Sequence, residues 1–484
     1  MNPRLIRPVS LVRHLGAWRA PGAGAAWRQL AGALRLLILD GRLPLEARLP
    51  GERELAQALG LSRTTVSSAY GLLRDEGFLT GGQGEAVRTT LPSGPRTRAV
   101  GEARPEAVAG VIDMTSATLP ADANVHAAYV RALARLPAQL PGHGYETAGL
   151  EELREAVAAH YGRRGLPTSP GQILITHGAH NGLVHLLRLM VRAGDPVVID
   201  HPTYPHAIDA ILAAGGRPLP VALPEDAGSG WDIDGLASAC RSSGAAMAYL
   251  VPDHNNPTGR LMGAPERTRL LGLLKGVSTL LVLDETLVEL TLSGDPAVSA
   301  SSIDAPRIVR LGSMSKSVWG GLRIGWIRAD RALIQRLAQS RASLDLGVPI
   351  LEQLAAVELL NDGGAALSAR RRLLRARRDH LLSRLAERLP DWTCPRPDGG
   401  LSVWAQLPGP ISSALTVQAA SEGLRLAAGP RFGVDGAFEN RLRLPYTLSE
   451  VELDTAVERL ARAYGKLGRQ RPVTRRAVNA DPVY

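Results

Sequence analysis

Apolar residues recur at helical spacing near the amino terminus of the chain. In residues 27–40 (WRQLAGALRLLILD) they lie three and four positions apart, which predicts a helix that ends at Gly41. Pro50 can open a second helix through ERELAQALG, because its missing N–H is not needed in the first turn, and Gly60 can end that helix. Two short amphipathic helices are therefore expected before Leu61.

A third helix is expected over SRTTVSSAYGLLRDEG, which begins at Ser62. The Ser62 side chain can cap the first turn, and Val66, Tyr70 and Leu73 share one apolar stripe. The following GFLTGGQGEAVRTT predicts two short strands around a glycine-rich turn at residues 81–84. Three helices followed by a hairpin are typical of a winged helix-turn-helix.

The pattern changes beyond residue 110. Apolar runs typical of buried strands (QILIT, PVVID, AAMAYLVP and TLLVLDE) alternate with helical stretches such as LEELREAVAAHYGRRG and NGLVHLLRLMVRAG. This alternation predicts an α/β sheet domain with buried strands. The segment before this domain, LPSGPRTRAVGEARPEAVAG, is rich in Pro, Gly, Ala and Arg. Its apolar residues show neither helical nor strand periodicity, which indicates a linker.

The chain is therefore expected to be multidomain, with a mainly α head and a larger α/β domain. Its 484 residues allow two or three units. The expected division is a winged helix-turn-helix at residues 24–91, a linker at 92–110, an α/β domain at 111–467 with a small α+β C-terminal subdomain from about 365 to 467, and a basic tail at 468–484.

Composition narrows the function without deciding it. The net charge of +10 and the pI near 10.1 are consistent with binding to a polyanion, although arginine-rich helices are often only solvated faces. Cys240 and Cys394 lack ligand-like neighbours, so neither a disulfide framework nor a metal site is expected. No apolar run reaches bilayer-spanning length and the amino terminus lacks a signal-peptide core, so a cytoplasmic protein without a membrane partner is expected.

The third helix carries residues suited to DNA. A recognition helix places its first residues against base edges and its neighbours against phosphates, and Arg63 can do either. Arg53 and Thr64 are candidate contacts to the phosphate backbone, and a merely capped surface helix is the alternative. The residues expected to contact a double-stranded DNA operator are Arg53, Ser62, Arg63, Thr64, Thr65 and Gly82.

A second motif, GSMSKSVWGGLRIGW, is suited to pyridoxal phosphate. This cofactor needs a lysine for an aldimine, an acid near its pyridine nitrogen, an aromatic face and donors for its phosphate. Lys316 follows Ser313 and Ser315 and precedes Arg323, so an amine and several phosphate donors can converge there. The alternative is a lysine exposed on an ordinary turn.

The other groups that the cofactor needs follow predicted strands. Asp284 ends the strand LLVLD, where its carboxylate can keep the pyridine nitrogen protonated or can simply cap a helix. Asn256 in DHNNPTG can donate to the ring hydroxyl oxygen, and Tyr204 in HPTYPHA can stack on the ring. Gly178 and Ala179 stand at a strand-to-helix junction, where free backbone donors favour a phosphate.

Both regions resemble known families. The block LPGERELAQALGLSRTTVSSAYGLLRDEGFL resembles the winged helix-turn-helix of GntR-type regulators, and residues 111–466 resemble the fold-type I aminotransferases. Joined in one chain, the two resemble the MocR subfamily. This resemblance implies a pyridoxal-phosphate domain that forms a head-to-tail homodimer and reports an amino-acid-like or vitamin B6 effector to the DNA-binding head.

The resemblance also implies that an arginine late in the chain binds a carboxylate. Arg443 in RLRLPY is expected to bind the carboxylate of the effector, and Arg441 shares its face if this segment is a strand. Tyr145 in GYETAGLEELR is expected to reach a cofactor phosphate across the dimer interface.

The chain departs from the family at one place. Relatives have Asp followed shortly by Tyr, whose phenol bonds the ring oxygen, whereas this chain reads DETL, so Thr286 or Leu287 replaces that phenol. Thr286 can donate a hydrogen bond but lacks the acidity and reach of a phenol. Cofactor binding is expected to survive this change more easily than efficient transamination.

Three functions remain open from the sequence. The first is a dimeric DNA-binding transcriptional regulator that senses its ligand through an aldimine at Lys316, with at most a weak or half-reaction transaminase activity. The second is a working aminotransferase with an appended DNA-binding unit. The third is a regulator whose aminotransferase domain no longer holds cofactor. The first is preferred because the two motifs occur together.

Overall fold

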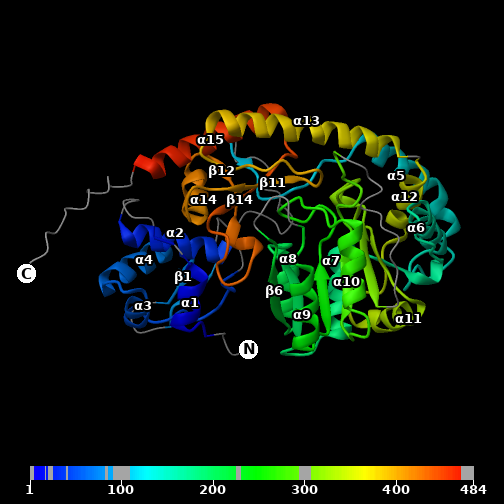
Figure 1. Cartoon of the computed structure of the whole chain (residues 1–484), viewed down its shortest axis with the longest axis horizontal. Coiled ribbons are helices and arrows are strands. Elements are labelled where there is room, and N and C mark those ends of the chain that lie inside the picture. The colour runs from blue at the N-terminus through cyan, green and yellow to red at the C-terminus, as the bar shows by residue number, and fades with distance from the viewer. Residues whose placement is uncertain are drawn as a thin grey trace, which may run out of the picture.

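The chain folds into a head, a large unit and a small unit, and in Figure 1 the small unit lies between the head on the left and the large unit on the right. The computed structural model describes residues 5–16, 18–19, 25–39, 42–81, 86–90, 110–224, 230–293, 307–362 and 364–469. Residues 92–109 of the expected linker, residues 470–484 of the expected tail, and Gly41 and Gly82 lie outside the described residues.

The head contains the predicted helices and hairpin. Ser62 caps the third predicted helix, its hydroxyl accepting a hydrogen bond from the Thr65 amide at 3.1 Å, and Gly60 ends the second with φ +63°. The second helix begins at Glu52 rather than at Pro50, since Gly51 is its N-cap residue. The elements of the head are α1 (Pro8–Leu15), α2 (Ala26–Leu39), α3 (Glu52–Leu59), α4 (Arg63–Asp75), β1 (Leu79–Thr80) and β2 (Arg88–Thr89).

The core of the head extends upstream of the predicted boundary at residue 24. The stripe on α4, Val66, Tyr70 and Leu73, is fully buried, as predicted. Leu11 and Leu15 of α1 are buried in the same cluster, so α1 completes the core. The sequence analysis missed α1 because one short amphipathic turn carries little periodic signal by itself.

The large unit is a seven-stranded sheet in the order β4-β10-β9-β8-β7-β5-β6, covered by helices. All neighbours are parallel except β10, which is antiparallel to both β4 and β9. The four predicted strands are β4, β5, β7 and β8, and their residues are almost wholly buried. The carboxyl ends of the parallel strands therefore meet at one edge, where ligands bind in such sheets.

The elements of the large unit are α5 (Ala123–Arg135), α6 (Glu151–Arg163), β4 (Ile173–Thr176), α7 (Ala179–Met190), β5 (Pro196–His201), α8 (Pro205–Ala213), β6 (Arg217–Ala222), α9 (Ile233–Ser243), β7 (Met247–Leu250), α10 (Ala264–Leu273), β8 (Leu280–Asp284), β9 (Ile308–Ser313), β10 (Gly325–Arg328), α11 (Arg331–Ser340) and α12 (Ile350–Leu360). Short 3-10 turns lie at Leu136–Ala138, Pro170–Gln172, Gly320–Leu322 and Arg341–Ser343.

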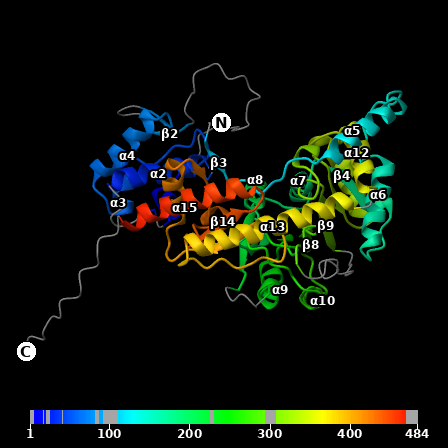
Figure 2. The same cartoon turned by 90° about the horizontal axis from the view of Figure 1, so that it is seen from above.

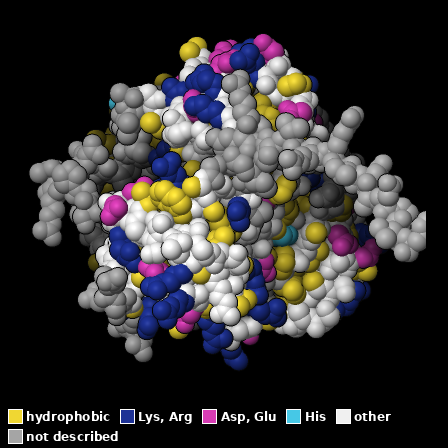
Figure 3. Space-filling model, turned by 90° about the vertical axis from the view of Figure 1, so that its left-hand side faces the viewer, with side chains coloured by type: hydrophobic (Ala, Val, Ile, Leu, Met, Phe, Trp, Pro, Cys, Tyr) yellow, Lys and Arg dark blue, Asp and Glu magenta, His cyan; other side chains and the backbone are white. Residues whose placement is uncertain are grey.

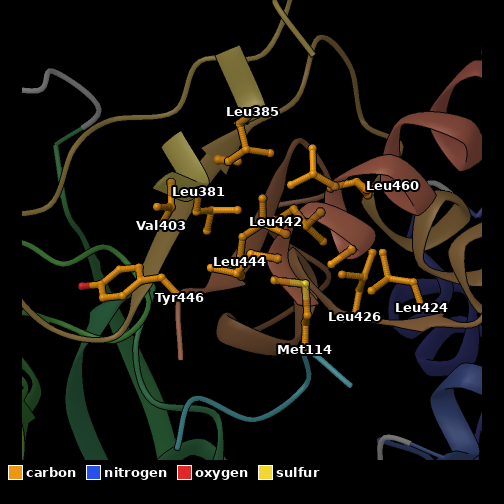
Figure 4. Packing of buried hydrophobic residues seen from close by; sticks show 14 of the residues in the cluster. Met114, Leu381, Leu385, Val403, Leu424, Leu426, Leu442, Leu444, Tyr446 and Leu460 are labelled. Atoms are coloured by element: carbon orange, nitrogen blue, oxygen red, sulfur yellow. The ribbon is translucent and has the colours of Figure 1, made fainter. Parts of the chain in front are cut away.

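The small unit packs helices against a three-stranded sheet in the order β11-β14-β13. Figure 4 shows leucines of the sheet and of α13 and α15 pointing toward one another in its core. The strand β3 precedes the large unit but pairs with β12, so the small unit draws on residues outside 365–467. Its elements are β3 (Ile112–Asp113), α13 (Ala365–Arg388), β11 (Ser402–Gln406), α14 (Ser412–Ser421), β12 (Leu424–Arg425), β13 (Ala427–Ala428), a 3-10 turn (Gly429–Phe432), β14 (Arg441–Pro445) and α15 (Glu450–Arg469).

Helix α13 joins the large unit to the small one and runs along the top of the molecule beside α15 (Figure 2). On its other side the small unit contacts the head, where α14 packs against α2. The small unit therefore lies between the sheet edge and the head. No helix in the described part of the chain combines the length and the apolar character that a membrane crossing requires.

The substitution Leu73→Ala is expected to destabilise the head by about 2–5 kcal/mol, because Leu73 is fully buried and its truncation leaves a cavity. Amide exchange of peptides from α2 and α4 measures the loss. Ser68→Ala, on the exposed face of the same helix, is the control and should change stability by less than about 0.5 kcal/mol. Equal effects of the two substitutions would contradict this placement of the buried face.

Candidate functional site

A cavity of about 500 Å³ lies at the carboxyl edge of the large sheet, against the small unit. Eleven of the twelve residues predicted to bind the cofactor or the effector carboxylate line it; only Tyr145 is absent. The eleven are Gly178, Ala179, Tyr204, Asn256, Asp284, Thr286, Ser313, Ser315, Lys316, Arg323 and Arg443.

One end of the cavity is suited to a phosphate. Helix α7 begins there after Gly178, whose φ of +81° turns the chain from β4 into the helix. A Cβ atom on Gly178 would lie 3.0 Å from a guanidinium nitrogen of Arg323, so glycine permits this close approach. The Ser313 and Ser315 hydroxyls lie 3.0 Å apart on the neighbouring loop. A helix N-terminus, a guanidinium and two hydroxyls are a donor set that fits a phosphate group.

Lys316 supplies an amine inside the cavity. Burial, followed by the nearby positive charge of Arg443, lowers the pKa of Lys316 to about 8, although the Asp284 carboxylate opposes this shift. Its Nζ donates to the Ala117 carbonyl at 3.0 Å. A lysine with this pKa is neutral in an appreciable fraction of molecules near pH 7, and a neutral amine can attack an aldehyde.

Asp284 is held at the end of β8 by two donors. The Tyr249 hydroxyl lies 2.5 Å from Oδ2, and the Thr286 amide donates to Oδ1 at 2.9 Å. Burial raises the pKa of Asp284 above its ordinary value, and these two hydrogen bonds partly offset that effect. An arriving cation such as a protonated pyridine nitrogen would favour the ionised carboxylate in this buried place.

Aromatic and polar groups complete the wall beside Asp284. Tyr204 follows β5, and burial raises its pKa to about 12, so its ring is a neutral phenol that can cover a flat ligand. Asn256 and Thr286 both line the cavity. Leu287, the other residue expected at the place of the family's phenol, lines the cavity too and is 6% exposed.

Arg443 approaches the cavity from β14 of the small unit. Its guanidinium lies over the Phe432 ring, with Cζ 4.9 Å from the ring centroid, and it donates to the Thr115 carbonyl. Its buried Nε has no hydrogen-bond partner among the described residues. Burial lowers the pKa of Arg443 to about 10, and an anionic ligand would offset this cost. The guanidinium therefore fits a carboxylate.

Several cavity residues were missed by the sequence analysis. His180 stands in the first turn of α7 and His206 near the start of α8, and the ring of each lies edge-on to Tyr204, at 6.1 and 5.4 Å. Burial lowers the pKa of His180. Its position two residues after Gly178 was a usable signal. Residues 115–118, by contrast, reach the cavity only through tertiary folding after β3, and no local pattern marks them.

Tyr145 does not line the cavity of its own chain. Its side chain is 60% exposed and stacks on His143 with ring centroids 5.9 Å apart. Its expected role across a dimer interface stays a prediction. Among the described residues, no group of three or more His, Cys, Asp or Glu side chains is arranged to hold a metal ion.

The predicted DNA-binding residues of the described head lie on its surface around the start of α4. The Arg63 side chain is 58% exposed and its Nε donates to Glu52 at 3.3 Å, while Arg53 and Thr64 are also exposed. The Ser62 hydroxyl lies 2.8 Å from the Thr65 hydroxyl, within the cap of the helix. Figure 3 faces this end of the molecule, where Lys and Arg side chains gather in several groups. Such groups favour a phosphate backbone.

Comparison with protein families identifies two regions. The family of class I and II aminotransferases matches residues 110–460, and the gntR family of bacterial regulatory proteins matches residues 27–88. The first match covers the large and small units, and the second covers the head from α2 to β2.

Comparison with individual proteins gives relatives of both kinds. The chain is 33% identical to a 2-aminoadipate transaminase of Thermus thermophilus, over 66% of this chain and 80% of the relative. It is 28% identical to the probable rhizopine catabolism regulatory protein MocR of Rhizobium meliloti, over 78% of this chain and 81% of the relative. It is 26% identical to the HTH-type transcriptional regulator YisV of Bacillus subtilis, over 91% of this chain and 96% of the relative.

Solved structures agree with the sequence comparisons. The α-aminoadipate aminotransferase LysN of Thermus thermophilus, complexed with N-(5'-phosphopyridoxyl)-L-leucine, superposes with a TM-score of 0.66 at 30% identity, over 75% of this chain and 94% of LysN. The match at this coverage is to the aminotransferase part.

The amine of Lys316 is expected to react with pyridoxal phosphate at a rate that rises about tenfold per pH unit below pH 8 and levels off above it, because its pKa is about 8 and only the neutral amine attacks. Stopped-flow absorbance measures the profile. Arg443→Gln should move the midpoint to higher pH by removing a nearby positive charge, and Arg217→Gln on β6 should not. A midpoint near the ordinary lysine value of 10.5 would contradict this reading of the cavity.

Proposed function

The chain belongs to the class I and II aminotransferase family and is a regulator of the MocR/GntR type, and from this premise we propose that its large unit binds pyridoxal phosphate covalently at Lys316. Arrival of the cofactor, or of an amino-acid-like ligand whose carboxylate binds Arg443, changes the affinity of the head for a DNA operator. The regulator acts in the cytoplasm as a homodimer.

The convergence of four groups in one cavity carries this proposal. Lys316 lies in a loop, Asp284 ends β8 and Arg443 lies within β14, and the α7 N-terminus with Arg323 forms the phosphate end. Bound there, pyridoxal phosphate supplies an aldehyde carbon that bonds to amines and a ring that withdraws electrons. The phosphate end would anchor the cofactor, Asp284 would orient the ring nitrogen, and Arg443 would select ligands with a carboxylate.

The cavity favours sensing over rapid turnover. Leu287 can offer neither a proton nor a hydrogen bond, so the ring oxygen of a bound cofactor would depend on polar side chains such as Asn256 and Thr286. The similarity to a 2-aminoadipate transaminase supports a second candidate, slow transamination. Assaying keto-acid release over many cycles separates the two: a stoichiometric product supports the sensor, and continued release supports the transaminase.

The experiment that tests cofactor binding is borohydride reduction of the protein after incubation with pyridoxal phosphate, followed by peptide mapping. The proposal predicts one modified peptide that carries the phosphopyridoxyl group on Lys316. Lys275→Ala, which removes a lysine just after α10 that does not line the cavity, is the control and should leave labelling unchanged. Lys316→Ala should abolish it. Labelling spread over several lysines would overturn the proposal.

The substitution Arg63→Ala is expected to weaken DNA binding about 5- to 150-fold, because one lost base contact removes roughly 1–3 kcal/mol. Fluorescence anisotropy with a duplex selected from a random library by the unsubstituted protein measures the affinity. Arg217→Ala removes the same charge from the exposed surface of β6 and serves as the control. Similar losses from both substitutions would point to nonspecific attraction by net charge.

A mixed dimer tests whether Tyr145 serves the partner's cavity. One subunit carries Lys316→Ala and the other carries Tyr145→Ala. If Tyr145 reaches across the interface, one cavity keeps both residues and binds pyridoxal phosphate with the native affinity. If Tyr145 acts within its own chain, no cavity gains from the mixture, and the affinity matches the weakened affinity of the Tyr145→Ala homodimer. A Tyr145→Ala homodimer that binds pyridoxal phosphate with native affinity would show that Tyr145 serves neither cavity. Equilibrium titration by absorbance distinguishes these outcomes.

A further inference from the structure

We propose that the small unit transmits ligand binding in the cavity to the head through two connected parts. These are the segment of residues 429–439 and helix α14, whose start is hydrogen-bonded to the end of that segment. This proposal rests on the function proposed above and adds the route by which the two sites communicate. The segment 429–439 begins directly after β13 and ends one residue before β14, the strand that carries Arg443.

At its first end the segment contacts both walls of the cavity. The Phe432 ring packs against the Arg443 guanidinium, 4.9 Å from Cζ, so a carboxylate that moves Arg443 also moves Phe432. The Phe432 carbonyl accepts a hydrogen bond from the Thr203 amide at 3.0 Å, one residue before Tyr204. A ligand that touches Arg443 or Tyr204 therefore acts on the same short turn.

The next residues attach the segment to the end of strand β5. The Val434 amide donates to the His201 Nε2 at 3.1 Å, and the Phe438 ring lies 4.5 Å from the His201 ring. Asp435 and Phe438 have φ values of +55° and +68°, which residues other than glycine rarely adopt. Such conformations persist where the surroundings hold them, so the loop is fixed by its contacts on both sides.

At its far end the same loop lies against the head. Gly436 faces the carboxyl end of α1, where a Cβ atom would lie 3.2 Å from the Arg13 carbonyl. The Asp435 carboxylate pairs with the Arg13 guanidinium at 3.7 Å. Both of these side chains are well exposed, so the pair contributes little energy, and the approach of the backbone at Gly436 is the second contact of the loop with α1.

Helix α14 provides the second contact with the head. The Glu439 carboxylate accepts from the Ser413 amide at 3.0 Å and from its hydroxyl at 2.6 Å, which fixes the start of α14 to the end of the loop. Along the helix, Val417 faces Gly32 of α2, where a Cβ atom would lie 3.5 Å from Val417 Cγ1. A movement of the loop thus displaces α14 at its first turn, and α14 carries it to α2.

The physical basis is that packed contacts shift together. The ligand can shift the equilibrium between two arrangements of the head only by the difference in its binding free energy for those two arrangements. Coupling between sites of this kind commonly amounts to a factor of about 5 to 150 in affinity. The contact of α14 with α2 should set most of that factor here, because Gly32 and Val417 are packed side by side while the Arg13 pair is exposed.

The test compares two charge substitutions on the same helix. Val417→Glu places a carboxylate in the contact with α2, and Ala420→Glu places one on the exposed face of α14. DNA affinity is measured by anisotropy on the selected duplex, with and without saturating N-(5'-phosphopyridoxyl)-L-leucine. The affinity of that adduct is measured separately by tryptophan fluorescence, which shows whether the cavity of each variant is intact.

The unsubstituted protein and Ala420→Glu should show a change in DNA affinity of about fivefold or more on adding the adduct. Val417→Glu should lose most of this change and keep its affinity for the adduct. Arg13→Glu, an exposed substitution that does not threaten folding, should reduce the change by a smaller factor.

Two results would overturn the inference while leaving the proposed function intact. One is a full response in Val417→Glu, and the other is an unsubstituted protein that binds the adduct without any change in DNA affinity. If the adduct fails to bind the unsubstituted protein, the proposed function itself fails, and the inference fails with it. Measuring the adduct affinity first keeps these cases apart.

Discussion

The burial of charge at the carboxyl edge of the large sheet is the constraint on which the rest of the structure depends. Lys316, Asp284 and Arg443 share one cavity, and charges held away from water are costly unless they are paired. The fold meets this cost with a Tyr249 hydroxyl on Asp284 and an aromatic face under Arg443. The positive groups that remain incompletely paired, Lys316 and Arg443, are those that an anionic, aldehyde-bearing ligand would bind.

The same constraint explains why the small unit is indispensable to the site. Arg443 belongs to β14, so the cavity closes only where the small sheet meets the large one. The small unit also lies against the head through α14 and the loop after Phe432. One unit therefore takes part both in ligand binding and in the support of the DNA-binding surface, which is the arrangement that a regulator requires.

Much of this could be predicted from local pattern. Ser62 and Gly60 mark helix ends by backbone chemistry alone, and the motif around Lys316 places an amine beside phosphate donors within a few residues. Residues 115–118 and His206 could not be assigned to the cavity, because only tertiary folding brings them there. Helix α1 was not predicted, because its two buried leucines form a core only by packing against the other helices of the head. The loop at residues 433–438 likewise has no periodic signal.

The central claim is that the cavity and the head are coupled, and coupling between two binding sites is reciprocal. The most direct measurement is therefore the calorimetric affinity of N-(5'-phosphopyridoxyl)-L-leucine for the whole protein, alone and saturated with its selected DNA duplex. The account predicts that DNA shifts this affinity by the same factor by which the adduct shifts DNA affinity. An adduct that binds with one unchanged affinity in both conditions would contradict the account, because the head and the cavity would then be independent.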